Sequence, residues 1–190
     1  AHAIYKARES LEGPCIVAFA DTLFKADFNF DTTQDGLIWV KQVDNPASFG
    51  VVKANEDNII TDFVEKSPVF VSDQAIVGIY YFRDGAYFRS QVERLINQNI
   101  KDKGEFQITS VLELMKNQGT RFRKATIEEW LDCGNMENVL DTNRRVLELK
   151  ENLEQLIDPS VDLQNSKIIP PCYIGPNTQI RNSVIGPFVS

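Results

Sequence analysis

The chain has 190 residues, a net charge of −7, and a composition that is 43% hydrophobic and 25% charged. These values describe a folded globular domain with room for a small appendage, and they exclude a largely disordered chain. The acidic balance argues against a nucleic-acid partner, which needs a basic face, and no apolar run is long enough to suggest a membrane partner.

The first elements of the chain are predicted to be a helix and a buried strand. Residues 3–11 carry apolar side chains at helical intervals, and Gly13 with the following proline ends that helix. Residues 15–20 are apolar at every position, which is typical of a strand buried on both faces at the centre of a parallel α/β sheet. Asp21 follows at the carboxyl end of this strand.

The middle of the chain is rich in strand signals. Residues 37–43 read as a strand, and 49–54 and 59–66 flank a polar turn, which predicts a β-hairpin. A further buried strand is expected over 75–82.

Helical periods follow over 86–99 and 108–117, then a short strand over 121–127 and a long helix from Met136 to Leu156. This alternation predicts an α/β fold with a mainly parallel, Rossmann-like sheet and helices on both faces.

The pattern changes after Asp158. Ile168, Ile174 and Ile180 recur every six residues, which is the hexapeptide period of a left-handed parallel β-helix. About one coil fits before the chain ends, and a single coil would lack a neighbour to stack on. We therefore expect two domains, a catalytic part over 1–157, and a linker with the first β-helix coil over 158–190.

The cysteines give no sign of a metal or redox centre. Cys15, Cys133 and Cys172 are far apart and form no CxxC pair. Three free thiols are typical of a reducing compartment, so a cytoplasmic location is expected.

Two aspartates are expected directly after a strand, before the next element begins. In open α/β sheets ligands bind beyond the carboxyl ends of the strands, where Asp21 and Asp132 are expected. Two such carboxylates suit Mg²⁺, which takes one or two carboxylates together with substrate phosphates and water. On position alone, Asp21 is equally a helix cap or turn residue, and Asp132 is slightly better explained as the cap of the long helix.

Glu65 and Lys66 end the second strand of the predicted hairpin. A lysine offers a compact positive charge to a phosphate, and a glutamate accepts hydrogen bonds from sugar hydroxyls. Without further context, an exposed Glu-Lys pair is most simply a solvated surface pair.

The order of the motifs is more informative than any of them alone. Six segments occur in this order: Asp21; 45–52 (NPASFGVV); Glu65-Lys66; 78–80 (GIY); 105–109 (EFQIT); and 130–134 (WLDCG). As an ordered set, they resemble the sugar-1-phosphate nucleotidylyltransferase family, in particular its glucose-1-phosphate thymidylyltransferase and mannose-1-phosphate guanylyltransferase branches. The resemblance covers about residues 1–150, and the hexapeptide tail resembles the β-helix that many members carry.

The resemblance implies an enzyme that joins a nucleoside triphosphate and a sugar 1-phosphate into a nucleotide sugar, releasing pyrophosphate. Asp21 and Asp132 match the family aspartates that hold the catalytic Mg²⁺. Lys66 matches the lysine that contacts the sugar phosphate, and Glu65 the glutamate that binds sugar hydroxyls. Gly50 and Thr109 match two further positions beside the sugar, which completes the expected substrate-binding set of Gly50, Glu65, Lys66 and Thr109.

The sequence also departs from the family pattern. Phe49 replaces a tyrosine, Ser67 separates Glu65-Lys66 from the following proline, and Gln107 and Ser110 stand where acidic residues are usual. The Gly-rich loop that cradles the triphosphate in the family is absent from these 190 residues. We therefore expect this chain to be inactive alone, and either to form a homo-oligomer or to associate through a truncated sheet edge.

Two other functions remain open on the sequence. One is a regulatory paralogue that binds sugar phosphate or nucleotide without turnover, which retention of Asp21, Asp132 and Lys66 disfavours. The other is a hexapeptide-repeat acyltransferase, which would use a histidine that residues 160–190 do not contain. The nucleobase and the sugar are not indicated by the sequence.

Overall fold

A computed structural model describes residues 1–26 and 28–190 of the chain. They form two compact units, Ala1–Trp130 and Leu131–Ser190. Within the described residues, no helix is long and apolar enough to cross a membrane.

The first unit is built on a six-stranded sheet. Its strands are β1 (Cys15–Ala18), β3 (Gly36–Gln42), β4 (Gly50–Ala54), β5 (Ile60–Glu65), β6 (Gln74–Phe82) and β7 (Phe122–Thr126). The order is β5-β4-β6-β3-β7, and β1 pairs with the carboxyl-terminal half of β6. Only β3 and β7 run parallel among the described pairs of this sheet. The prediction of a mainly parallel sheet is therefore wrong, because an apolar run reports burial on two faces and not strand direction.

Strand β1 differs most from its prediction. It pairs antiparallel with β6, and its side chains alternate between half-buried and exposed, with Ile16 54% exposed. The central positions belong instead to β3 and β6, whose side chains are buried over most of their length. The predicted hairpin is confirmed, since β4 and β5 pair antiparallel from Gly50 opposite Glu65.

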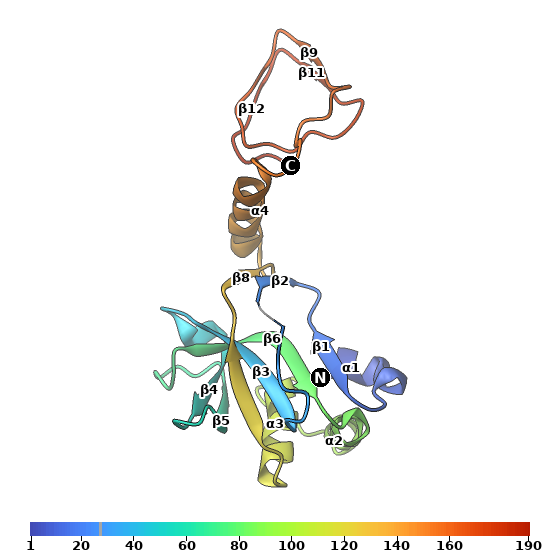
Figure 1. Ribbon diagram of the computed structural model, residues 1–190, viewed down its shortest axis with the longest axis vertical. Helices are drawn as coiled ribbons and strands as arrows, with labels where there is room; N and C mark the ends of the chain where they lie inside the picture. The colour runs from blue at the N-terminus through green and yellow to red at the C-terminus, as the bar shows by residue number, and fades with distance from the viewer. Residues whose placement is uncertain (27) are drawn as a thin grey trace. The chain divides into compact units, whose positions relative to one another are not determined.

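The helices of this unit pack on one face of the sheet (Figure 1). These are α1 (His2–Lys6), α2 (Gly85–Asn97) and α3 (Ile108–Asn117), with short 3₁₀ turns at Arg8–Ser10 and Pro46–Ser48. Apolar residues of all three helices join alternate residues of the strands in a single core. Alternation along the strands sends the intervening side chains to the opposite face.

Aromatic residues, rather than helices, cover that opposite face. Phe28 and Phe30 lie with their ring centroids 5.4 and 5.3 Å from that of Trp39, and Phe30 lies 4.9 Å from Tyr81. These phenylalanines follow β2 (Thr22–Lys25). The prediction of helices on both faces is thus wrong for the described residues of this unit, because a segment of irregular chain supplies the second apolar layer.

The second unit begins inside β8 (Glu129–Asp132) and continues with α4 (Met136–Lys150). Asn135 caps this helix, its side-chain oxygen accepting a hydrogen bond from the Asn138 N–H at 2.9 Å. The helix ends six residues before the predicted Leu156, although the apolar period continues. Leu153, which belongs to that period, is 80% exposed, so no packing supports a further helical turn there.

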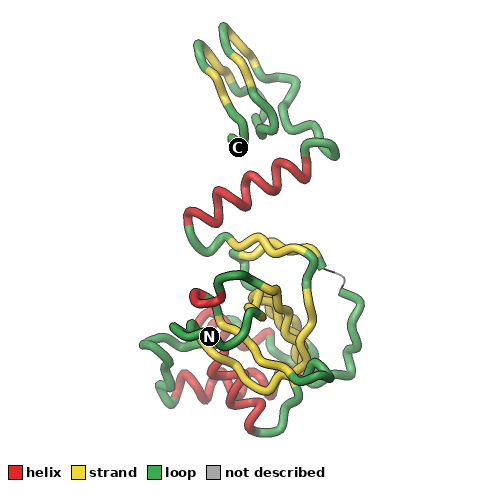
Figure 2. Tube along the Cα trace, turned by 90° about the vertical axis from the view of Figure 1, so that its left-hand side faces the viewer, coloured by secondary structure: helices red, strands yellow, loops and turns green. Residues whose placement is uncertain are grey.

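Short parallel strands form the rest of the second unit. Strand β9 (Asp162–Gln164) pairs with β11 (Gln179–Arg181), and β10 (Lys167–Ile168) pairs with β12 (Val184–Ile185), each at an offset of 17 residues. Figure 2 shows these strands in yellow near the C-terminus. The expectation of a single unstacked coil is wrong, because the segment before Ile168 already supplies the neighbouring layer.

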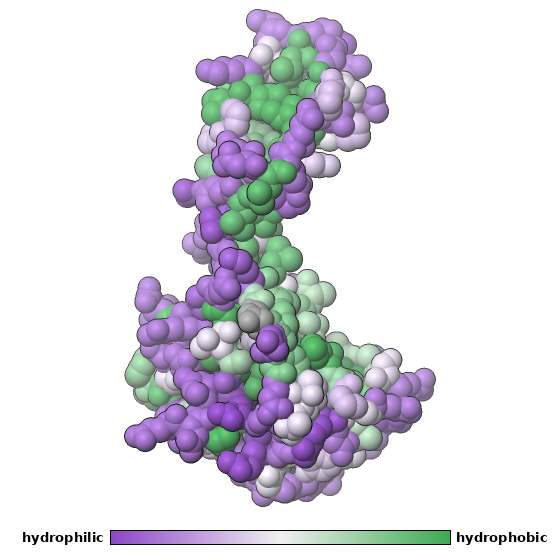
Figure 3. All heavy atoms as spheres, in the orientation of Figure 1, coloured by the Kyte–Doolittle hydropathy of each residue, from purple (hydrophilic) through white to green (hydrophobic). Residues whose placement is uncertain are grey.

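The second unit also has a small apolar core. Buried Cys172, Ile174 and Ile180 pack there with half-buried neighbours. Other apolar residues of this region remain on the surface, including Leu163 and Val184, and Figure 3 shows the resulting apolar surface around these strands.

Candidate functional site

The β4–β5 hairpin brings the first of the predicted substrate-binding residues together. Gly50 opens β4, directly opposite Glu65 at the end of β5. The short 3₁₀ turn at Pro46–Ser48 leads into β4, and its N-cap Asn45 accepts a hydrogen bond from the N–H of Ala47. The 3₁₀ turn therefore precedes the start of the strand, and the strand register places Gly50 beside Glu65.

Thr109 completes this group from the first turn of α3. Its hydroxyl donates a hydrogen bond of 3.0 Å to Glu65 Oε2, and its side chain is buried, with 5% of the residue exposed. A Cβ atom added to Gly50 would lie 3.0 Å from Glu65 Oε2 and 3.2 Å from Thr109 Cγ2. Gly50 therefore leaves room for the other two, and we call these three residues the Glu65 cluster.

Two residues of β6 lie near the Glu65 cluster: Tyr80, which belongs to the GIY segment, and Ile76, which was not singled out from the sequence. Ile76 Cδ1 lies 3.5 Å from the position of a Cβ on Gly50. Burial, together with the nearby charge of Glu65, raises the pKa of Tyr80 well above its ordinary value, so its phenol stays neutral. Both sit within a continuous apolar run, where the sequence gives no sign that one face meets polar groups.

Trp130, the first residue of the WLDCG segment, packs near the hairpin. Its ring centroid lies 5.0 Å from that of Phe49, the neighbour of Gly50. Its indole Nε1 is buried and has no hydrogen-bond partner within the described part of the chain. A buried donor without a partner is costly, and the Trp130 ring packs with the Trp39 and Tyr81 cluster on the face of the sheet opposite the Glu65 cluster.

Lys66 follows Glu65 with an unusual backbone. Its φ angle is +42°, in the left-handed region that lysine seldom adopts, and its N–H donates to the Phe49 carbonyl at 3.1 Å. The side chain is exposed, and its ammonium makes no ion pair or hydrogen bond with any described residue. The charge is therefore available to an anionic ligand beside the Glu65 cluster.

Asp21 lies in the first unit and Asp132 in the second. Asp21 occupies the exposed turn between β1 and β2, where no helix follows, which removes the helix-cap alternative. Asp132 ends β8, and its carboxylate accepts hydrogen bonds from the Gly134 N–H at 3.2 Å and from the Asn138 side-chain amide. Because Asn135 is the cap of α4, the cap alternative for Asp132 is also wrong.

Both carboxylates offer the oxygen ligands that a hard divalent cation prefers. The Asp21 side chain has no described polar partner, and each Asp132 oxygen keeps a lone pair beyond its hydrogen bond. Over the described residues, no group of three or more His, Cys, Asp or Glu could hold a metal without other ligands.

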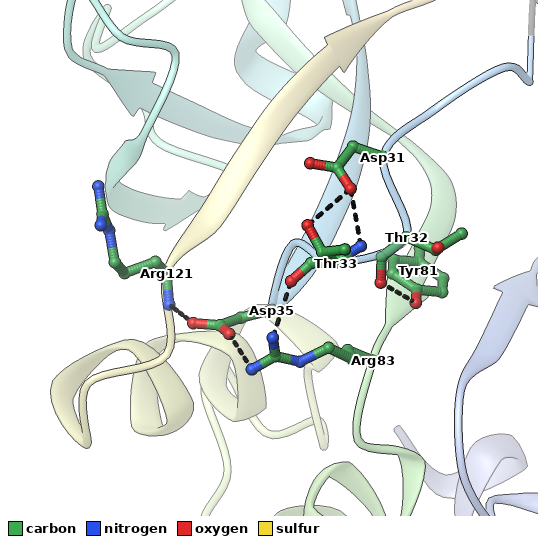
Figure 4. A network of polar contacts seen from close by, with 7 residues as sticks. All are labelled: Asp31, Thr32, Thr33, Asp35, Tyr81, Arg83 and Arg121. Atoms are coloured by element: carbon green, nitrogen blue, oxygen red, sulfur yellow. Dashed lines mark hydrogen bonds and ion pairs between the residues drawn. The ribbon is translucent and has the colours of Figure 1, made fainter.

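A separate polar network holds the chain before β3 (Figure 4). Arg83 donates to the Thr33 carbonyl at 2.8 Å and pairs with Asp35 at 2.6 Å, while Asp35 also accepts from the Arg121 N–H at 3.1 Å. Hydrogen bonds from Thr33, and from the nearby Gln34, lower the pKa of Asp31 to about 2. These contacts join the loop to β6 and to the chain before β7, and the carboxylates of Asp31 and Asp35 and the guanidinium of Arg83 each have a protein partner.

Comparison with known proteins identifies the family. The family model described as nucleotidyl transferase matches residues 1–148. The chain belongs to the nucleotidyl transferase family. Among related proteins, a glucose-1-phosphate thymidylyltransferase of Streptomyces antibioticus is 31% identical over 170 residues, covering 80% of this chain and 46% of that protein. A glucose-1-phosphate adenylyltransferase of Clostridioides difficile (strain 630) is 29% identical over 201 residues, covering 97% of this chain and 51% of that protein.

A solved structure shares the fold. A UDP-glucose pyrophosphorylase complexed with UDP-glucose superposes with a TM-score of 0.63 at 19% sequence identity, covering 78% of this chain and 62% of that one. The chain spans about half the length of the curated relatives that it matches.

Proposed function

We propose that the protein containing this chain transfers a nucleotidyl group from a nucleoside triphosphate to a sugar 1-phosphate, releasing pyrophosphate. The observation that carries the proposal is the pairing of the Glu65 cluster with the unpartnered ammonium of Lys66 at the end of the same strand. A carboxylate that accepts from hydroxyls, next to a cation that suits a phosphate, matches the two ends of a sugar 1-phosphate.

The reaction would need positioning more than covalent chemistry. An oxygen of the sugar phosphate attacks the α-phosphorus, a new phosphorus–oxygen bond forms, and the bond to the departing pyrophosphate breaks. Lys66 would hold the attacking phosphate, and Glu65 would accept hydrogen bonds from the sugar hydroxyls. Together they would fix the nucleophile in line with the phosphorus.

Asp21 and Asp132 would hold Mg²⁺ in this proposal, through the carboxylate oxygens that fit a hard cation. A bound Mg²⁺ would neutralise charge that develops around the α-phosphate during the transfer. The hydrogen bonds from Gly134 and Asn138 would keep the Asp132 carboxylate oriented toward its ligand.

Pyrophosphate release tests the proposal. The whole protein is incubated with Mg²⁺ and with each combination of five nucleoside triphosphates and a panel of sugar 1-phosphates, a design that also identifies the base and the sugar. One combination should be turned over, and Asp21→Asn or Asp132→Asn should each lower kcat about 100-fold or more, as expected when transition-state charge is no longer stabilised. Binding of sugar 1-phosphate without turnover of any combination would indicate the regulatory paralogue instead.

The remaining parts of the proposal concern architecture. We propose that residues 1–157 form part of the catalytic domain and that the parallel layers within 158–190 begin a left-handed β-helix. The two stacked layers and their aliphatic core support this. Exposed Ile16 on β1 supports association through that strand in a homo-oligomer, which sedimentation of the whole protein would test.

A further inference from the structure

The loop between α2 and α3 carries a lysine that is bonded to the backbone of the proposed phosphate-binding residue. Lys103 Nζ donates to the Glu65 carbonyl at 2.8 Å and to the Lys66 carbonyl at 2.6 Å. No other side chain bonds to either of these carbonyls among the described residues. Two consecutive peptide groups on either side of the Lys66 Cα are thus held by one ammonium.

This double contact depends on the backbone of Lys66. In an extended strand, consecutive carbonyls point in opposite directions and cannot meet the same donor. The φ angle of +42° at Lys66 breaks that alternation, so that the carbonyls of Glu65 and Lys66 converge on Lys103. The hydrogen bond from the Lys66 N–H to the Phe49 carbonyl fixes the other side of the residue.

Lys103 is itself held in a conformation that lysine seldom adopts. Asp102 and Glu105 exchange two backbone hydrogen bonds, of 2.9 and 3.0 Å, around a tight turn. The two central residues, Lys103 and Gly104, have φ angles of +50° and +83°, the pattern of a type I′ turn. Asparagine, aspartate or glycine is favoured at the first of these positions, so a lysine there is retained against its local preference.

Lys66 and Lys103 both have left-handed backbone, and the Lys103 ammonium holds the carbonyls on both sides of the Lys66 Cα. Strained backbone persists where the neighbouring structure over-determines it, and such positions gather at ligand-binding sites. Lys66 keeps its own side chain free, while Lys103 uses its ammonium on the backbone.

We propose that Lys103 is a positioning residue that fixes the left-handed backbone of Lys66 and thereby aims the Lys66 ammonium at the phosphate of the sugar 1-phosphate. The proposal rests on the proposed function for the role of Lys66, but the restraint on the backbone does not. Lys103 acts through Lys66, and its effect should disappear when the Lys66 side chain is absent.

A double-mutant cycle on the whole protein measures this dependence. Lys103→Met should raise the KM for sugar 1-phosphate about 10-fold, the size expected for loss of hydrogen bonds from a charged donor, while the KM for nucleotide stays within about twofold. In a Lys66→Ala background, the same change should add less than about twofold, because the group that Lys103 positions has been removed. Lys103→Arg keeps a charged group with at least two donors, so its KM for sugar 1-phosphate should be close to that of the wild type.

Lys101→Met is the matched control. It removes the same charge from the same loop, but Lys101 lies over the Phe106 ring and makes no contact with the Glu65 or Lys66 carbonyls. Its KM values should match those of the wild type. An equal rise in the KM for sugar 1-phosphate in Lys101→Met would show that the charge of the loop matters, and it would overturn the positioning role. Equal effects of Lys103→Met with and without the Lys66 side chain would also overturn it, in favour of direct phosphate contact.

Hydrogen exchange separates this inference from the proposed function. A peptide spanning residues 64–69, followed by mass spectrometry, reports the Lys66 amide that bonds to Phe49. Lys103→Met should accelerate its exchange about 10-fold, whether or not the protein turns over any substrate. Unchanged exchange would overturn the inference. Faster exchange in a protein that turns over no sugar 1-phosphate would leave the backbone restraint standing and remove the proposed function alone.

Discussion

The sheet core and the Glu65 cluster of the first unit are built by different means. In the core, Ile38, Val40 and Phe82 are fully buried among other apolar side chains, and close packing alone holds them. In the Glu65 cluster, the Thr109 hydroxyl donates a hydrogen bond to the Glu65 carboxylate, and atoms of both side chains lie within 3.2 Å of where a Cβ on Gly50 would be. The core tolerates apolar exchange of similar volume, whereas the cluster depends on individual atoms.

This difference predicts opposite consequences for substitutions. Changes in the core should reduce the free energy of unfolding and leave substrate specificity intact. Changes in the cluster should alter the KM for one substrate and leave stability nearly unchanged. The following variants test that separation.

Phe82→Ala should have the largest effect on stability. The Phe82 ring is fully buried, with its centroid 3.7 Å from that of Phe88 and 6.2 Å from that of Phe122. Its removal should lower the free energy of unfolding by about 3–5 kcal/mol, measured by urea denaturation. Phe82→Leu should cost clearly less, and the KM values of the folded fraction should not change. A selective rise in one KM would contradict the expectation that core substitutions change stability and not substrate binding.

Gly50→Ala should affect the cluster without unfolding the protein. The added methyl would stand 3.0 Å from the Glu65 carboxylate and 3.2 Å from Thr109, so one of the two must move. We expect the KM for sugar 1-phosphate to rise about 10-fold, with less than about 1 kcal/mol lost in stability. Gly175→Ala is a suitable control, since nothing lies within 4 Å of its Cβ position. Normal kinetics for Gly50→Ala would show that this close approach has no functional role.

Thr109→Val should have a smaller effect on the same KM. The valine keeps the shape of the threonine but removes the hydroxyl that donates to Glu65 at 3.0 Å. A rise of about threefold to tenfold is expected, because one hydrogen bond to a charged acceptor is lost. Thr109→Ser retains the donor and should restore most of the affinity. If the serine variant is as impaired as the valine variant, packing rather than the hydrogen bond explains the effect.

Asp31→Asn should give the smallest change, confined to a range of pH. The pKa of Asp31 is lowered to about 2 by hydrogen bonds from Thr33 and Gln34, below its ordinary value of 3.8. A lowered pKa stabilises the folded state above pH 3.8, and this contribution is lost as the pH falls toward 2. The variant should therefore be slightly less stable than the wild type near neutral pH and equal to it below pH 2, as thermal unfolding at each pH would show. A constant difference across that range would contradict the assigned cause.

The sequence predicts local elements better than their arrangement. The hairpin ending at Glu65, the strand over 75–82 and the helix over 108–117 are confirmed, because their patterns depend on local turns and periods. The parallel sheet is not, because burial of β3 and β6 on both faces does not depend on the direction of their neighbours.

The same limit applies to the candidate site. Gly50, Glu65 and Thr109 could be grouped from family resemblance, and their contacts agree with that grouping. Lys103 could not, because its relevance comes from contacts of its side chain with the backbone of a distant segment. Such a contact leaves no period or motif in the sequence.

The comparison of the two KM values in Lys66→Ala tests the central claim most directly. Lys53→Ala serves as its control, because Lys53 is an exposed lysine of the same hairpin, opposite Asp62. The KM for sugar 1-phosphate should rise about 10-fold or more in Lys66→Ala, while the KM for nucleotide stays within about twofold and Lys53→Ala behaves as the wild type. An equal rise of both KM values in Lys66→Ala, or the same rise in Lys53→Ala, would contradict the assignment of Lys66 to the sugar phosphate.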